Sequence, residues 1–164
     1  MGRFITADNQ LVYMVAAIGV VLNPTSNTQS FFGGGMVASG GKVPPQHDDD
    51  ILCLGISPDR KLAVTGQVGA QPKLFVWDIA TKTVKAQYKL GKNTRGIIAC
   101  RMSSDGKYVA FVDNSNDHNL YVISTSDSSL KSMRKTGPDP VTDLAWSKKA
   151  GDNRLCVVGM KLVK

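Results

Sequence analysis

The sequence predicts an all-β protein built from successive four-stranded units, and three observations support this prediction. Between His47 and Leu90, four short apolar runs follow one another, each bounded by Gly, Pro or Asp, and none keeps a helical period. The same stretch matches itself when it is moved forward by 46 residues. All 13 acidic residues are Asp and the chain has 16 Gly, which favours turns and strands over helices.

The stretch from His47 to Leu90 is the template for these units. Its third apolar run ends in Trp77-Asp78, the dipeptide that closes the third strand of a WD-repeat propeller blade, and His47 stands ahead of the first run. The strands expected from the apolar runs are Ile51–Ser57, Leu62–Thr65, Leu74–Asp78 and Val84–Leu90.

A second copy follows directly, because the 46-residue shift aligns apolar and turn positions without a gap. Ile51 falls on Ile97, and Asp59 falls on Asp105 of a sharp Asp-Gly turn. A further shift of 44 residues begins a third copy, with strands at Val141–Ser147 and Arg154–Gly159. A repeat of this length with four strands per unit is typical of β-propellers.

Upstream of the template, three more strands are expected as the later strands of another blade. They are separated from His47 by the Gly- and Pro-rich stretch Gly33–Gln46, which lacks periodicity and predicts a flexible surface insertion. Gly33–Gly35 is not followed by the helix and Lys-Ser/Thr pair that a phosphate-binding loop requires. The three expected strands are Leu11–Ala17, Gly19–Leu22 and Gln29–Phe32.

The sequence therefore predicts four segments along the chain. A partial blade and the insertion occupy 1–46, complete blades occupy 47–92 and 93–137, and a further blade starts in 138–164. Closed propellers have about 4–8 blades, whereas this chain supplies about three to four. The predicted fold is thus a partial WD-repeat β-propeller, a fragment of a larger closed ring.

Four residues of the template are predicted to hold its blade together. His47 in the loop, the Thr65 hydroxyl and the Trp77 indole are placed for a hydrogen-bond network, and Asp78 completes the dipeptide. In this fold an Asp six residues before the Trp completes the network, but Gln71 stands there. We therefore expect a partial network and a larger share of apolar packing.

The second copy shows the opposite pattern. It keeps the expected acid, Asp117, but has Ile123 and Ser124 in place of Trp-Asp. All of these residues are interpreted as structural.

The sequence supports catalytic or metal-binding roles for these residues less well than structural roles. Asp48-Asp49-Asp50 beside His47 fits a solvated loop better than a metal site. The loop from Asp113 to His118 lacks the Gly and the terminal acid that a calcium loop needs. No Ser/His/Asp or Cys/His spacing predicts a nucleophile, so no catalytic residue, metal ligand or cofactor is expected.

Net charge and hydropathy limit the kinds of binding partner that the sequence predicts. The formal charge of +7 favours acidic partners in general. The longest apolar run, Leu11–Leu22, is about half the roughly 20 residues of a membrane-spanning helix. No membrane association is therefore expected.

Basic residues gather on or beside the predicted fourth strands, which lie at the outer rim of a propeller. One interpretation is a positive stripe for an acidic partner; the other is that these lysines prevent edge-to-edge pairing. Interleaved aromatic residues, typical of single-stranded nucleic-acid sites, are absent, which favours a protein over a nucleic acid. The residues are Lys82, Lys85, Lys89, Lys92, Arg95, Lys131, Arg134 and Lys135.

Several longer strings go beyond a generic WD repeat. Together they resemble the first propeller of the echinoderm microtubule-associated protein-like family, and the likeness runs from about Leu11. The Thr-Gly-Gln and Asn-Ser-Asn-Asp-His strings are far more specific than Trp-Asp. The stretches concerned are Thr25–Gln29, His47–Leu54, Ser57–Asp59, Ala63–Val68 and Asp113–His118 with Leu120.

The resemblance implies a tandem pair of propellers that associates with tubulin or microtubules, in the cytoplasm and on the cytoskeleton, including spindle or cilium. It implies no cofactor and no enzyme activity. The alternative is a general WD-repeat adaptor that holds protein or peptide partners on its propeller faces, without a tubulin role.

Overall fold

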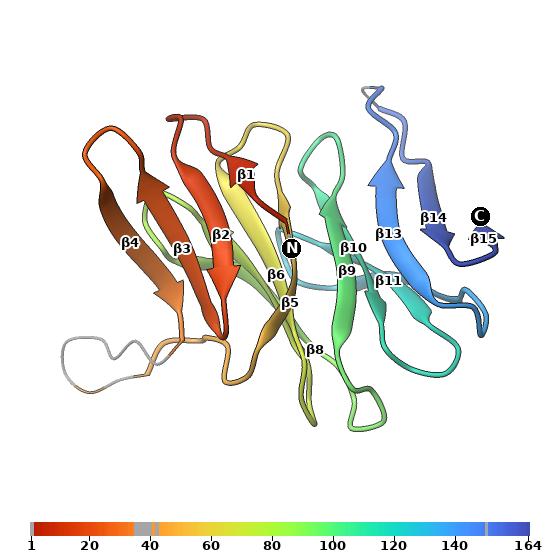
Figure 1. Ribbon diagram of the computed structural model, residues 1–164. Coiled ribbons are helices and arrows are strands. Elements are labelled where there is room, and N and C mark those ends of the chain that lie inside the picture. Colours follow the sequence, from red (N-terminus) through yellow and green to blue (C-terminus); the bar gives the residue numbers. More distant parts are fainter. Residues whose placement is uncertain (1, 35–40, 42, 150) are drawn as a thin grey trace.

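The computed structural model describes residues 2–34, 41, 43–149 and 151–164. Within these residues the chain folds into antiparallel β-sheets and contains no helix (Figure 1). The predicted all-β fold class is therefore confirmed.

Three four-stranded sheets and one three-stranded sheet follow one another along the chain, and in each sheet neighbouring strands are consecutive in sequence. The first contains β1 (Phe4–Ile5), β2 (Leu11–Val15), β3 (Ile18–Asn23) and β4 (Thr28–Gly33). The second contains β5 (Ile51–Ile56), β6 (Leu62–Gln67), β7 (Lys73–Asp78) and β8 (Val84–Lys89). The third contains β9 (Ile97–Met102), β10 (Tyr108–Asp113), β11 (Asn119–Ser124) and β12 (Leu130–Lys135). The fourth contains β13 (Val141–Trp146), β14 (Leu155–Gly159) and β15 (Leu162–Val163).

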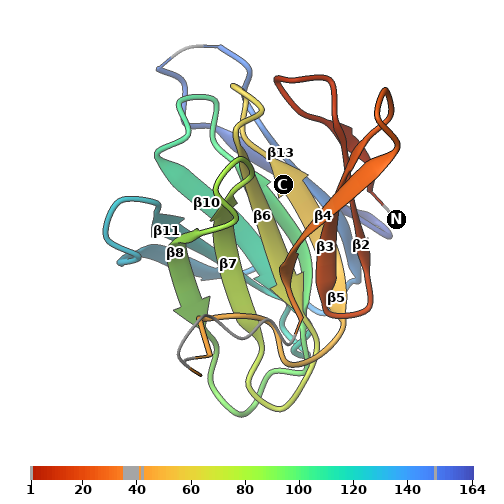
Figure 2. The ribbon, with the colours of Figure 1, turned by 90° about the vertical axis from the view of Figure 1, so that its left-hand side faces the viewer.

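The sheets are arranged as the blades of a partial propeller. They follow one another from left to right in Figure 1, and the turns after β1, β5, β9 and β13 all lie at its upper end. The first strands are neighbours across sheets, β5 beside β9 and β9 beside β13, whereas β8 and β12 form the far edges of their sheets. Figure 2 gives the second view of this arrangement.

The repeat extends to irregularities in the ladders. The first strands of the second, third and fourth sheets each carry a register shift near their start, at Leu52, Ile98 and Thr142. The turn after the first strand recurs too, with Arg60 and Gly106 both at positive φ, 60° and 71°. A β-bulge adds one residue and bends the strand, so these sheets share their curvature as well as their pattern.

Three apolar cores fill the spaces between successive sheets. Phe32 of the first sheet packs against Trp77 of the second, with ring centroids 5.2 Å apart. Leu74 and Phe111 belong to the core between the second and third sheets, and Leu144 to the core between the third and fourth. Burying one such side chain contributes about 1.5–3 kcal/mol, so contact between the sheets stabilises each of them.

Gly19 on β3 leaves room for the Phe32 ring, which packs over it from the neighbouring strand. It pairs with Phe32 on β4, and a Cβ atom at Gly19 would lie 2.1 Å from Phe32 Cζ. Since Phe32 is fully buried, its ring has no free space to move into. The Gly in this apolar run is therefore required by packing.

Two differences from the expected strands concern the ends of the chain. The first sheet holds a short strand, β1, that the sequence pattern did not indicate, because two residues carry no periodicity. The fourth sheet includes β15, its third strand. Residues 35–40 and 42 of the predicted insertion Gly33–Gln46 lie outside the described residues, and the division into blades at 46, 92 and 137 stays a prediction.

Candidate functional site

A chain of buried hydrogen bonds crosses the second sheet. The Trp77 indole donates from Nε1 to Thr65 Oγ1 at 2.8 Å, and the Thr65 hydroxyl lies 2.6 Å from His47 Nε2. All three residues are buried. The structure thus brings together three of the residues that the sequence assigns to the blade network.

The chain continues through residues that the sequence pattern did not single out. His47 Nδ1 lies 2.7 Å from Gln67 Oε1, and Gln67 Nε2 donates to Asp48 Oδ1 at 2.7 Å. Lys73 Nζ forms an ion pair with the same carboxylate at 2.6 Å. Gln71, at the spacing expected for the missing acid, has no place in this chain of bonds; Gln67, from the end of β6, contacts His47 instead.

These contacts define the state of the imidazole. Because an amide oxygen can only accept, His47 Nδ1 carries the proton and Nε2 accepts from Thr65. Burial lowers the pKa of His47 to about 4, an effect that Lys73 reinforces and that the Gln67 hydrogen bond and Asp48 oppose. His47 is therefore neutral at pH 7, and both ring nitrogens are occupied by structural bonds. Neither is available to bind a metal or to accept a proton from a substrate.

Asp78 is not part of this buried chain of bonds. Its carboxylate accepts from the backbone N–H groups of Ala80 and Thr81, at 3.0 and 2.9 Å, in the turn that follows β7. It also lies 3.7 Å from Lys85 Nζ. The backbone hydrogen bond from Thr81 is the main reason why the pKa of Asp78 lies below its usual value. Asp78 shapes the β7–β8 turn.

In the third sheet the buried polar centre is Asp113. Its carboxylate accepts hydrogen bonds from the backbone N–H and the hydroxyl of Ser115, and from the backbone N–H and the side-chain Nδ2 of Asn119. It also accepts from the Tyr121 hydroxyl at 3.0 Å. Asp117, the acid indicated by the sequence, is half-exposed and pairs with Lys135 at 2.8 Å. The structure therefore does not bring Asp117 into a buried network.

In the third sheet, aromatic and aliphatic packing takes the place of the hydrogen bond between Trp77 and Thr65 of the second sheet. The positions 46 residues after Thr65, Phe75 and Trp77 are Phe111, Tyr121 and Ile123. Phe111 and Tyr121 stack, with ring centroids 5.0 Å apart and an interplanar angle of 8°. The two blades thus use different chemistry at equivalent positions.

The basic residues of the rim occupy equivalent places on two outer strands. Lys85 and Lys89 are exposed on β8, and Lys131 and Lys135 are exposed on β12, 46 residues later. Lys85 and Lys131 also sit at bulges, where the register with the neighbouring strand shifts. Bulges and lysines both blunt sheet edges, so these positions suit edge protection as well as partner binding.

The other four predicted rim residues are less uniform. Arg134 lies on β12 and is exposed, whereas Lys92 and Arg95 are exposed in the connection from β8 to β9. Lys82 is half-buried in the β7–β8 turn and donates to the Ile79 carbonyl. Among the described residues, no ion pair involves Lys89, Lys92, Arg95 or Arg134, so their charges face solvent.

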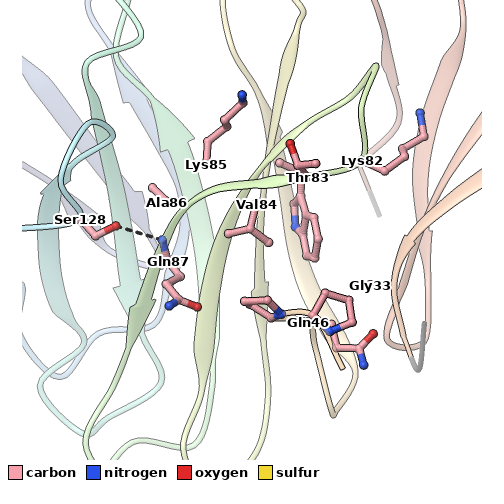
Figure 3. Close-up of a pocket in the computed structure, with 12 residues that line it drawn as sticks. Gly33, Gln46, Lys82, Thr83, Val84, Lys85, Ala86, Gln87 and Ser128 are labelled. Atoms are coloured by element: carbon pink, nitrogen blue, oxygen red, sulfur yellow. Dashed lines mark hydrogen bonds between the residues drawn. The ribbon is translucent and has the colours of Figure 1, made fainter. Parts of the chain in front are cut away.

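A groove runs along the outside of the second sheet (Figure 3). It has a volume of about 480 Å³ and lies against the outer strand β8. Figure 3 shows Lys82 and Lys85 extending from one end of the groove, Gln46 at the opposite end, and Val84 between them. The full lining comprises Gly33, Pro44, Pro45, Gln46, Trp77, Lys82, Thr83, Val84, Lys85, Ala86, Gln87 and Ser128.

One hydrogen bond links the edge of the groove to the next sheet. The backbone N–H of Gln87 on β8 donates to Ser128 Oγ at 3.1 Å, and Ser128 belongs to the turn between β11 and β12. The third sheet thereby supplies a hydrogen-bond acceptor for the Gln87 N–H, which would otherwise be unpaired on the edge strand β8. This contact limits pairing of β8 with a foreign strand.

Metal-binding clusters and membrane-spanning helices are both absent from the part of the chain that the structure describes. Within the described residues, no group of three or more His, Cys, Asp or Glu side chains could hold a metal ion. The same residues include no helix long and apolar enough to cross a membrane.

Comparison with known proteins identifies the repeat. The WD domain, G-beta repeat family matches residues 41–78, which contain β5, β6 and β7. The solved structures of U3-55K and of the RRP9 WD40 repeats superpose with TM-scores of 0.71 and 0.70, each covering 96% of this chain and 44% of that chain. Both are 15% identical in sequence, so this likeness concerns the fold.

Three curated relatives extend the comparison. The ciliary WD repeat-containing protein ctxp80 of Euplotoides octocarinatus is 39% identical over 98% of this chain. Echinoderm microtubule-associated protein-like 1 of Rattus norvegicus and of Homo sapiens are each 30% identical over 73% of it. The chain spans 23% of the length of the ciliary protein and 14% of each of the others.

Proposed function

We propose that this WD-repeat protein is a non-catalytic scaffold that associates with tubulin or microtubules, in the cytoplasm and on the cytoskeleton, including the cilium. The propeller supplies a rigid frame, and its outer strands supply the contact surface. No cofactor takes part. The observation that carries the proposal is the pair of exposed, positively charged outer strands on a chain related to ciliary and microtubule-associated proteins.

The names of the relatives support the cytoskeletal part of this proposal. One is a ciliary protein and others are microtubule-associated, and the chain aligns with the first over almost its whole length. The strings that resemble the echinoderm microtubule-associated protein-like family include Asp113–His118, which contains the buried Asp113.

The scaffold part of the proposal is supported by how the polar residues are used. His47 is neutral, and both of its ring nitrogens are occupied. Asp113 is surrounded by donors from its own sheet and loop. These side chains hold the blades in shape, while Lys89 on β8 and Arg134 on β12, which form no ion pair within the described residues, are left for contact with other molecules.

Co-sedimentation of the chain with stabilised microtubules tests this proposal. Because contacts between exposed charges are screened by salt, the bound fraction should fall clearly between about 0.05 and 0.3 M salt. The variant Lys89→Glu/Arg134→Glu should bind more weakly, whereas Lys148→Glu/Lys149→Glu changes the net charge equally in the β13–β14 loop and should bind as before. Binding that is absent, or insensitive to both salt and the rim variant, would overturn the proposal.

The second candidate is a general WD-repeat adaptor that holds protein or peptide partners on its propeller faces. The outer groove favours it, since a concave, mostly apolar surface can bind a peptide without any tubulin contact. A stable complex with a non-cytoskeletal protein, together with no microtubule binding, would select this candidate.

A further inference from the structure

We infer that the groove along β8 binds an acidic peptide segment in an extended conformation, with one apolar side chain of the peptide seated against Trp77. The inference deepens the proposed scaffold function and rests on it, because it assigns a class of partner to one surface of the scaffold. It is carried by the shape of the groove, its apolar floor and its charges.

The floor of the groove is apolar and rigid. Trp77 and Val84 are paired on adjacent strands of the second sheet and belong to the same apolar cluster, and Trp77 is held by its hydrogen bond to Thr65. Trp77 is also fixed by Phe32 and Phe75, whose ring centroids lie 5.2 and 5.3 Å away. Such a floor can accept an apolar side chain without loss of conformational freedom in the protein.

The walls of the groove come from three different parts of the chain. Gly33 ends the first sheet, Pro44 and Pro45 precede the second, and Ser128 belongs to the third. The groove is therefore formed when the blades pack together. Its volume of about 480 Å³ accommodates a few side chains, which suits a short peptide segment.

The charges of the lining select the sign of the partner. Lys82 and Lys85 are the charged residues among those that line the groove, and both stand at one end of it (Figure 3). Asp78 lies 3.7 Å from Lys85 Nζ and reduces, but does not cancel, this positive charge. A peptide with carboxylates beside its apolar residue would complement both features.

The backbone of β8 determines how such a peptide can lie. The outward N–H of Gln87 is already bonded to Ser128, so a continuous added strand cannot form along β8. Side-chain contacts must therefore dominate: carboxylates at Lys82 and Lys85, and an apolar residue over Trp77. An extended peptide places alternate side chains on the same side and meets this requirement.

A fluorescent ten-residue peptide, with a central Leu-Pro flanked by four Glu on each side, tests the inference by anisotropy. Two matched peptides carry Lys in place of Glu, or Ser-Gly in place of Leu-Pro. We expect binding of the first peptide, at least tenfold weaker binding of the Ser-Gly peptide, and none of the Lys peptide.

Two variants test the location. Reversal of both groove charges in Lys82→Glu/Lys85→Glu should weaken binding about tenfold, whereas Lys148→Glu/Lys149→Glu should leave it unchanged. Val84→Thr preserves side-chain shape, adds a hydroxyl to the floor, and should weaken binding of the Leu-Pro peptide alone. Circular dichroism and thermal unfolding confirm that each variant is folded.

Three outcomes would overturn the inference: no binding of the Leu-Pro peptide, equal binding of the Lys peptide, or equal weakening by both charge-reversal variants. These outcomes differ from failure of the proposed function. Peptide binding in the groove together with absent microtubule binding would leave the groove assigned and remove the tubulin role. Salt-sensitive microtubule binding that Lys89→Glu/Arg134→Glu weakens, without any peptide binding, would do the reverse.

Discussion

Gln67 and Asp113 are equivalent residues, 46 positions apart, and each is the buried polar centre of its blade. Gln67 joins His47 to Asp48 in the second sheet. Asp113 accepts hydrogen bonds from Ser115 and Asn119 in the third. In both blades, the last residue of the second strand fixes a loop to the sheet.

Substitution of Asp113 by Asn should destabilise the protein strongly. The amide keeps the shape but presents N–H groups to donors that need an acceptor, so buried donors lose their partner. We expect the free energy of unfolding to fall by about 2–3 kcal/mol, as measured in urea. Asp117→Asn is the control: it removes an exposed ion pair and should change the free energy by less than about 1 kcal/mol. Larger destabilisation by Asp117→Asn than by Asp113→Asn would contradict this assignment.

Thr65→Val should disconnect the buried hydrogen bonds of the second sheet. Valine has nearly the same volume, but it neither accepts from Trp77 Nε1 nor donates to His47 Nε2. Two buried polar groups are then unsatisfied, and the free energy of unfolding should fall by about 2–4 kcal/mol. Thr81→Val, in the exposed β7–β8 turn, is the matched substitution and should change it by less than about 0.5 kcal/mol. Similar effects of the two substitutions would argue against a stabilising role of the network.

The stability of the protein should depend on pH through His47. Its pKa is about 4 in the folded protein and 6.5 in its ordinary state, so the unfolded chain binds a proton first as the pH falls. Stability is therefore complete above about pH 6.5 and is lost progressively down to pH 4, with about 2 kcal/mol lost between pH 7.5 and 5. Urea titrations across this range measure the loss.

The variant His47→Gln isolates this effect. It removes the titrating group, so its stability should change little between pH 7.5 and 5, although it is lower throughout. Titration of Asp48 does not contribute to the change in stability between pH 7.5 and 5, because hydrogen bonds from Gln67 and Lys73 lower the pKa of its carboxyl below the usual 3.8. An unchanged pH dependence in His47→Gln would show that another group is responsible.

Gly19→Ala should destabilise the first sheet, because its methyl group would overlap the buried Phe32 ring. We expect a loss of about 1–3 kcal/mol, the usual range for an overpacked core. Phe32→Leu in the same chain makes room for the methyl group. The double variant should therefore lose less than the sum of the two single variants, and strict additivity would rule out this contact as the cause.

Most strands of the sheets could be predicted from the sequence, because each of these strands carries its own pattern of apolar residues. Apolar runs bounded by turn residues recur after 46 residues, and this recurrence located β5–β8 and β9–β12 to within a few residues. The short strand β1 escaped because a two-residue strand has no period. It forms only through pairing with β2, which is a tertiary effect.

The polar centres were harder to predict, for a geometric reason. Spacing along the chain from Trp77 indicated Gln71, and the corresponding spacing in the next blade indicated Asp117. The structure instead uses Gln67 and Asp113, which stand at the ends of β6 and β10, where the ladder with the first strand shifts register. The 46-residue shift aligns these two polar residues after apolar strands, and this was the signal that could have identified them.

The rim was predictable in composition but not in its contacts. Lysines on fourth strands could be read from the sequence, whereas their bulged positions and the surface ion pairs of Lys85, Lys131 and Lys135 depend on how strands meet. The groove beside them has walls from three sheets, so no single stretch of sequence could indicate it.

The bond from Gln87 to Ser128 also has a consequence for biosynthesis. Ser128 is made 41 residues after Gln87, so a nascent chain exposes the β8 donor to solvent until the β11–β12 turn has left the ribosome. The second blade is thus sealed by the third, in the direction of translation. A ribosome that stalls between these two points would hold a folded but adhesive intermediate, the kind of species that chaperones recognise.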